Sequence, residues 1–142
     1  MKIKIEKIDR SDVVVLSDRC RGYRGEFSCP MVRGWAILVP YSGGEEALAA
    51  GNHISVETGQ QSISEFRILE SSGTPTVSPL PSPGDYSVVG QVELDGGGQV
   101  FDVDVGGLLF TLDIEDTGGK VPRIGTWVSF HLHGLSLWDE NT

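Results

Sequence analysis

The sequence is poor in the side chains and motifs that most often carry catalysis. Its 142 residues include only two cysteines and three histidines. It contains no G-x-S-x-G elbow, no phosphate-binding P-loop and no G-x-G-x-x-G fingerprint. These absences predict a protein that is not an enzyme and that binds no cofactor.

Long apolar runs are also missing. The N-terminal stretch alternates lysine with isoleucine, which is typical of a strand and not of a signal peptide. No segment has the length of a membrane span, so we expect a cytoplasmic protein that enters no membrane. Cys20 and Cys29 have no histidine at a zinc-finger spacing. We expect them to be reduced thiols, with a hairpin disulfide as the alternative.

Positive charge is scarce in the second half of the chain. The whole sequence has 20 acidic and 11 basic side chains, for a net charge of −9. Residues 85–142 contain ten acidic side chains and only Lys120 and Arg123 as basic ones, so this part alone carries −8. Such a surface repels a phosphate backbone, which disfavours nucleic-acid binding and favours a basic protein partner. A net charge of this size is also compatible with self-association into a homo-oligomer.

Glycine is abundant, with 19 residues, and most apolar runs are short. This composition predicts a mainly β protein made of short antiparallel strands joined by tight turns. One short helix is expected at 43–51, where Glu, Ala and Leu lie between glycines. An irregular segment is expected at 18–34. The expected strands are 2–8, 12–17, 35–39, 53–57, 62–69, 87–94, 99–105, 108–114, 126–133 and 135–138.

Three parts are predicted along the chain. Residues 1–70 form an N-terminal β subdomain, and residues 86–142 form an acidic one. The segment 71–85 contains four of the seven prolines and is predicted to be a linker. Each half is expected to be a small barrel or sandwich.

An internal duplication is a further hypothesis. Gly51–Val56 aligns with Gly125–Phe130, an offset of 74 residues that continues to Ser62 and Ser136. In the C-terminal half, Val89-Gly90-Gln91-Val92 and Val121-Pro122-Arg123-Ile124-Gly125-Thr126-Trp127-Val128 loosely resemble an OB-type barrel. This resemblance, to an OB-type or related small β-barrel, covers about 50 residues and implies such a barrel in the C-terminal half. The acidic composition departs from the basic and aromatic face that such barrels use for nucleic acid.

Arginines and aromatic residues gather in the irregular segment of the first half. Interleaved on a Gly-rich loop, they are suited to stacking on bases or to an interface with another protein. The candidate binding residues of this segment are Arg19, Arg21, Tyr23, Arg24 and Arg33.

Two more sets of side chains are candidates in the second half. The carboxylates Asp102, Asp104, Asp113, Glu115 and Asp116 are expected to form a solvated acidic face that binds a partner. His131 and His133 alternate on an expected strand, so their rings share a face and are candidate metal ligands, with Asp139 as a third.

These observations favour a non-enzymatic protein-binding module. Bacterial immunity proteins, which neutralise a basic toxin, share its size, its acidity and its lack of catalytic groups. An inhibitor of the immunity or antitoxin type, with a basic partner protein, is therefore the leading hypothesis. The alternatives are a small-ligand or metal-binding barrel that uses His131 and His133, and oligonucleotide binding through the Arg19–Arg33 loop.

Overall fold

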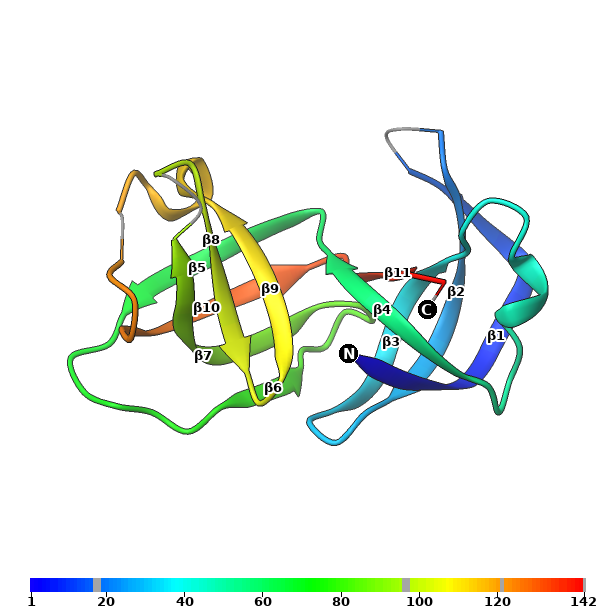
Figure 1. The fold of residues 1–142 in the computed structure, drawn as a ribbon, viewed down its shortest axis with the longest axis horizontal. Helices are drawn as coiled ribbons and strands as arrows, with labels where there is room; N and C mark the ends of the chain where they lie inside the picture. Colours follow the sequence, from blue (N-terminus) through cyan, green and yellow to red (C-terminus); the bar gives the residue numbers. More distant parts are fainter. Residues whose placement is uncertain (17–18, 96–97, 121, 142) are drawn as a thin grey trace.

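The fold is mainly β, as the composition predicts. The computed structural model describes residues 1–16, 19–95, 98–120 and 122–141. These residues form two lobes that lie side by side (Figure 1). Their strands are β1 Lys2–Val15, β2 Arg21–Ser28, β3 Arg33–Val39, β4 His53–Gly59, β5 Ser62–Ile68, β6 Thr76–Pro79, β7 Tyr86–Asp95, β8 Val100–Val105, β9 Leu108–Asp113, β10 Trp127–His133 and β11 Ser136–Asp139.

The first lobe is a closed barrel of five strands. Its strand order is β1-β2-β3-β11-β4, and β4 pairs with β1 to close the ring. All pairs are antiparallel except that of β3 with β11, which is parallel. The 3-10 turn η1, Glu45–Ala47, lies between β3 and β4 in the chain.

The second lobe is a six-stranded antiparallel sheet. Its order is β5-β10-β7-β8-β9, and β6 pairs with the first half of β7. A second 3-10 turn, η2 Ile114–Thr117, follows β9. Within the described ranges, each half therefore contains three strands, a 3-10 turn and two strands in the same order, with β6 between the halves.

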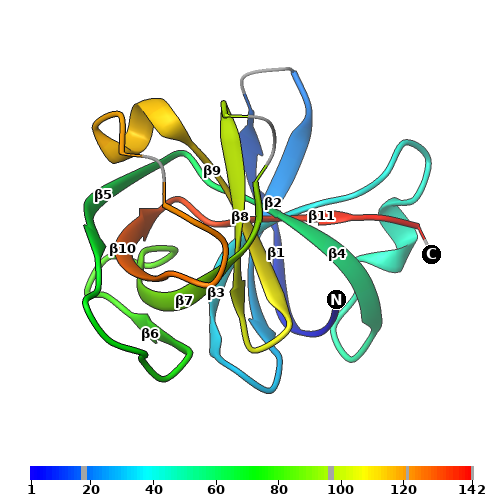
Figure 2. The ribbon, with the colours of Figure 1, turned by 60° about the vertical axis from the view of Figure 1, so that its left-hand side comes forward.

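The two lobes exchange strands. After β4, the chain leaves the barrel and continues as β5 in the second sheet, while after β10 it leaves that sheet and continues as β11 in the barrel. The segments 53–68 and 127–139 thus form one long antiparallel ribbon that crosses from lobe to lobe (Figures 1 and 2). The register is continuous through the crossing, because Gly59 pairs with Ser136 and Ser62 pairs with His133.

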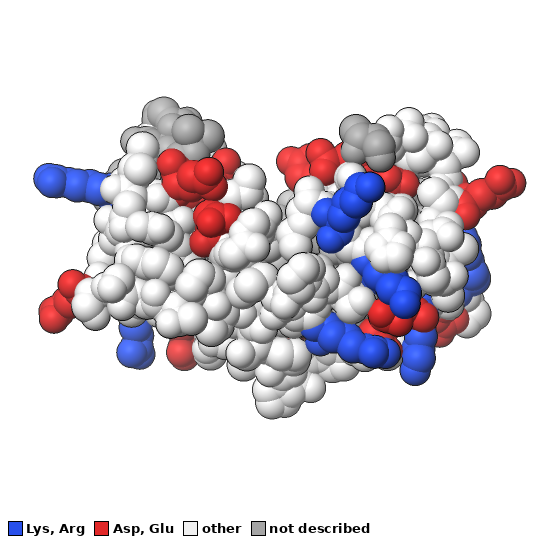
Figure 3. Space-filling model, turned by 60° about the horizontal axis from the view of Figure 1, so that its bottom comes forward, with Lys and Arg blue, Asp and Glu red and all other residues white. Residues whose placement is uncertain are grey.

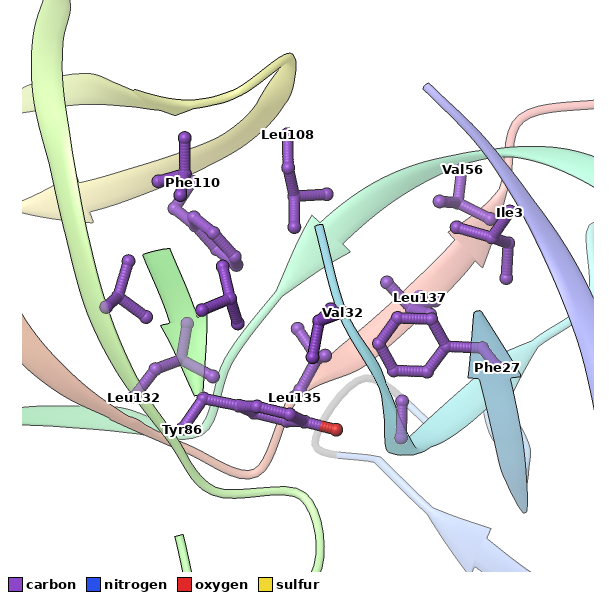
Figure 4. Packing of buried hydrophobic residues seen from close by; sticks show 14 of the residues in the cluster. Ile3, Phe27, Val32, Val56, Tyr86, Leu108, Phe110, Leu132, Leu135 and Leu137 are labelled. Carbon is purple, nitrogen blue, oxygen red and sulfur yellow. The ribbon is translucent and has the colours of Figure 1, made fainter. Parts of the chain in front are cut away.

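A joint hydrophobic core follows from this exchange. The buried residues of both lobes form one cluster (Figure 4). Leu137 of β11 is fully buried beside Ile3 and Phe27 of the barrel, and Tyr86 and Leu135 lie where the lobes meet. In β8, Phe101, Val103 and Val105 are buried and alternate with half-buried aspartates, as the sequence predicts.

Several local predictions are wrong. The strands expected at 2–8 and 12–17 are one long bent strand, β1, with register shifts after Ile5 and Ile8 that absorb its polar middle. The expected irregular segment contains β2, in which Gly22 and Gly25 are buried. A Cβ at Gly25 would lie 2.5 Å from a Leu38 side-chain carbon and 2.7 Å from the Lys7 carbonyl oxygen, so the glycine allows close strand packing.

Two further expectations need correction. The expected helix at 43–51 is only the 3-10 turn η1, too short for its Ala and Leu residues to stabilise an α-helix. The expected linker includes β6, whose backbone pairs with β7. The two sheets also do not follow the expected subdomains 1–70 and 86–142, since β5 belongs to the second sheet and β11 to the barrel. Part of the turn expected at 95–98, namely Gly96 and Gly97, and Val121 of the OB-like pattern lie outside the described residues.

The OB resemblance predicts a small barrel in the C-terminal half, but β7 to β10 of that half lie in the second sheet. The closed five-stranded barrel is instead formed by β1 to β4 together with β11, because β11 pairs with β3 and β4. Across the described ranges, no helix has both the length and the apolar character that a membrane span requires.

Candidate functional site: a groove over strand β3

A groove runs across the outer face of the barrel at β3. Alternate residues of a strand face opposite sides of a sheet, so Ala36 and Leu38 enter the core while Trp35 and Ile37 face outward. Trp35 is 41 % exposed, a high value for a tryptophan. The neighbouring strand β2 adds Arg24 at the same face. We call this feature the β3 groove.

The β3 groove consists of three hollows that share residues. The largest has a volume of about 700 Å³ and is bounded by the end of β1, by Arg24 and Ile37, and by Trp138 of β11. A narrow hollow at Trp35 and Ile37 connects it to one of about 420 Å³ beside Arg33. One wall of the second large hollow is the proline-rich segment 79–86, which therefore shapes a site as well as connecting two strands.

A buried tyrosine fixes the floor of the groove. The Tyr86 hydroxyl donates a hydrogen bond of 2.5 Å to the Trp35 carbonyl oxygen, which joins the start of β7 to β3. Burial raises the pKa of this hydroxyl well above its ordinary value, so it remains a donor. Gly34 has no side chain because a Cβ there would lie 2.2 Å from the tyrosine oxygen. The backbone under Trp35 is thus tied to the start of β7.

The arginines of the groove have acidic neighbours. Arg24 Nε lies 3.0 Å from Asp12 Oδ2, and Arg33 Nε donates to Glu26 Oε1 at 2.6 Å. The hydrogen bond to Glu26 raises the pKa of Arg33 further. Figure 3 shows that Lys and Arg gather on the barrel lobe, interspersed with Asp and Glu. The groove is therefore amphipathic, with little uncompensated positive charge.

The structure separates the five candidates of the arginine-rich segment. Arg24 and Arg33 line the β3 groove. Arg21 is exposed at the start of β2, and Arg19 lies in the preceding loop with φ of 69°. Tyr23 is only 8 % exposed, under the guanidinium of Arg10 at 5.2 Å, so its ring is not available for stacking on a ligand.

Three of the five candidate carboxylates have local structural contacts. Asp102 accepts a hydrogen bond from the Thr111 hydroxyl, and Asp104 accepts one from the Gly107 amide at the β8–β9 turn. Asp113 caps η2 by accepting from the Glu115 amide. Glu115 and Asp116 are exposed on that turn.

An acidic cleft of about 300 Å³ lies where β4 meets β9. Three carboxylates line it, those of Glu57, Asp102 and Glu140, together with the exposed side chain of Leu109. The cleft brings Asp102 together with two acidic residues that the sequence does not single out. Their separation in the chain gives no local motif by which they could have been found.

His131 and His133 share the outer face of β10, as predicted. Over the described ranges, no three His, Cys, Asp or Glu side chains are grouped so that they could hold a metal ion. Both ring nitrogens of His133 have polar partners, Ser64 and Asp85. Asp139 lies on β11 in the barrel. Cys29 is a free, partly buried thiol, in agreement with the expected reduced state.

Comparison with protein-family models, with curated proteins and with solved structures gives no match to this chain, so its function has to be inferred from its own residues.

Proposed function

We propose that the chain is a protein-binding module that holds an extended segment of a basic partner protein in the β3 groove. The observation that carries this proposal is the exposed Trp35, whose backbone is bonded to Tyr86. Arg24 lies beside it, and the exposed valines at the end of β1 lie close by. Tryptophan and arginine dominate the energetic centres of protein interfaces. An inhibitor of the immunity or antitoxin type would neutralise its partner by binding it in this way.

The apolar surface around the groove supports a polypeptide ligand. Val15, at the end of β1, is 66 % exposed, and the nearby Val13 is 45 % exposed. The backbone of Ile5 bonds to Gly51 and Asn52, and beyond Ile5 the edge of β1 opposite β2 pairs with no strand among the residues that the structure describes. Edge strands of this kind accept an added strand from a partner through their backbone groups.

The charge distribution supports a basic partner. The net charge of −9 attracts a basic protein at long range and raises its association rate. The acidic cleft at Glu57, Asp102 and Glu140 has room for a lysine or arginine side chain of such a partner. Added salt should therefore slow association more than it speeds dissociation.

Selection from a library of random peptides displayed on phage tests the proposal. We expect enriched peptides that combine an apolar or aromatic residue with lysine or arginine. Trp35→Ala should weaken the binding of an enriched peptide about 30-fold, equivalent to about 2 kcal/mol. Ile124→Ala is the matched control, because Ile124 is 63 % exposed and lines neither the groove nor the cleft.

Two results would contradict the proposal. One is a selection that enriches no peptide. The other is an enriched peptide that binds the Trp35→Ala and Ile124→Ala proteins equally well, which would place its site outside the β3 groove.

Oligonucleotide binding in the same groove is the second candidate. It is favoured by Trp35 between Arg24 and Arg33, because an exposed ring flanked by cations can stack on a base. The ion pairs with Asp12 and Glu26 weigh against it. A fluorescent oligothymidylate distinguishes the two candidates: this function requires binding that falls steeply with salt and is lost in Arg24→Ala.

We also infer that the chain arose by internal duplication. Support comes from the offset of 74 residues, which brings the first residue of β4 onto that of β10 and the first residue of β5 onto that of β11. The common element order of the halves supports it too. The β3 groove and the acidic surface of the second half would then have diverged from the same ancestral surface.

A further inference from the structure

Three polar side chains from distant segments meet on the outer face of the second sheet. The Ser64 hydroxyl of β5 lies 2.7 Å from His133 Nε2, at the end of β10. The other ring nitrogen, Nδ1, lies 3.0 Å from Asp85 Oδ2, in the residue before β7. All three residues are partly exposed, with 32 % exposure for the His133 side chain and 24 % for that of Asp85.

The sheet and a backbone hydrogen bond hold these residues in place. In the β5–β10 pair, His133 faces Ser62 and His131 faces Ser64, so Ser64 is the diagonal neighbour of His133 on the same face. The second oxygen of Asp85 accepts the Gly134 amide at 3.1 Å, which ties the carboxylate to the residue after the histidine. The arrangement thus depends on backbone positions as well as on side-chain rotamers.

The hydrogen bonds assign the proton positions. The hydrogen bond from His133 lowers the pKa of Asp85, which is therefore ionised near neutral pH. An ionised carboxylate only accepts hydrogen bonds, so Nδ1 of the ring carries the proton. In the neutral ring Nε2 is then the acceptor, and the Ser64 hydroxyl donates to it. A nucleophile bonded to a base, itself oriented by an acid, is the arrangement that activates serine.

We propose that Ser64, His133 and Asp85 form a nucleophilic triad that takes an acyl group from an activated ester. Ser64 is the nucleophile and His133 the general base, while Asp85 is a positioning residue that holds the ring. This activity is independent of the binding proposed for the β3 groove, although Asp85 also lines that groove.

The reaction proceeds in two steps. Ser64 Oγ forms a bond to the ester carbonyl carbon while His133 Nε2 takes the hydroxyl proton. The tetrahedral adduct then collapses, and the carbon–oxygen bond to the alcohol breaks as that alcohol takes the proton from the imidazolium. Water next attacks the acyl-serine with His133 again as the base, which releases the carboxylic acid and restores Ser64.

The backbone around Ser64 supports this role. The register of the β5–β10 pair shifts between Ser129 and His131, and Glu65, next to the serine, has φ of 54°. Such a left-handed conformation is costly for a residue other than glycine, and strain of this kind is concentrated at functional sites. A β-bulge leaves one residue outside the ladder, so its amide is a candidate donor to the oxyanion.

A fluorophosphonate probe tests the triad on the whole chain. In the labelling reaction Ser64 Oγ bonds to phosphorus, fluoride leaves, and His133 takes the hydroxyl proton. We expect one adduct in the intact mass spectrum, placed on Ser64 by peptide mapping. Ser64→Ala should abolish it, whereas Ser62→Ala, with its serine on the same strand, should be labelled at the wild-type rate.

The other members of the triad have their own variants. His133→Gln should slow labelling about 100-fold, the lower end of what a general base contributes. Asp85→Asn should slow it by about tenfold or more, and Asp85→Glu should restore a large part of the rate, which a purely structural role would not explain. Urea denaturation of each variant shows that the fold is retained.

The proposal is overturned by either of two results. The first is a wild-type protein that stays unlabelled while a serine hydrolase in the same tube is labelled. The second is labelling that persists in Ser64→Ala. Turnover of p-nitrophenyl acetate, measured alongside, should depend on the same three residues.

Discussion

Truncation of Leu137 tests the strand exchange most directly. This side chain is fully buried and belongs to β11, the strand that the second half of the chain contributes to the barrel. Leu137→Ala removes three carbon atoms, each worth about 0.8 kcal/mol of burial, or about 2.4 kcal/mol together. The cavity left behind adds to this, so we expect a loss of about 3 kcal/mol in the free energy of unfolding.

Urea denaturation measures this loss. With a slope of about 2 kcal/mol per molar urea, the midpoint should fall by about 1.5 M. Tryptophan fluorescence reports on both lobes, because Trp35 lies in the barrel and Trp127 in the second sheet. Since the core is joint, fluorescence and circular dichroism should show one transition with the same midpoint. Leu109→Ala, at a residue 44 % exposed, should change the stability by less than about 0.5 kcal/mol.

Two outcomes would refute the reasoning. A loss below about 1 kcal/mol would mean that the barrel does not depend on this strand for its packing. A transition that splits, with the second lobe unfolding at the wild-type midpoint, would mean that the lobes are energetically independent.

Three other perturbations follow from contacts described above. Tyr86→Phe removes the hydrogen bond to the Trp35 carbonyl and should cost about 1–2 kcal/mol in urea denaturation, because the acceptor stays part-buried. Gly25→Ala should cost more than about 2 kcal/mol by the same measurement, since the new methyl group meets a carbonyl oxygen at 2.7 Å. Asp85→Asn should destabilise the protein at neutral pH. The hydrogen bond from His133 lowers the pKa of Asp85 from 3.8, so the contribution of the carboxylate to stability is present above pH 3.8 and is lost as the pH falls through the lower folded value. Thermal melting of wild type and variant from about pH 6 to about pH 3 should show the difference in their stability shrink.

The second half of the fold was largely predictable from local sequence. The strict alternation of apolar and polar residues in β8, β9 and β10 specifies both the strands and their buried faces. The glycine pair Gly106-Gly107 marks the β8–β9 turn because both residues have positive φ. Such signals need no knowledge of distant residues.

The first half was harder because tertiary contacts override its local pattern. Arg21–Ser28 looks like a loop, since its glycines and arginines have low strand propensity. Its two glycines are nevertheless buried against β3 and β1, a role that is visible only in the assembled barrel. The bent strand β1 is similar, as its polar middle gives no sign that the strand continues.

The sites were the least predictable. The β3 groove needs a wall from residues 79–86, about a third of the chain away from its floor at Trp35. Ser64, Asp85 and His133 lie on three separate segments, and no sequence motif joins them. The alternation of His131 and His133 predicts their shared face, but the partners of His133 depend on strand register, which a single sequence does not give.

The exchange of final strands also has a consequence for synthesis on the ribosome. The barrel cannot close when β1 to β4 have emerged, because its fifth strand consists of residues 136–139. Until then β3 and β4 each present an unpaired edge, which is open to pairing with another nascent chain. We therefore expect slow folding that is completed only after β11 is released, and a dependence on chaperones that a self-contained barrel of the same size would not have.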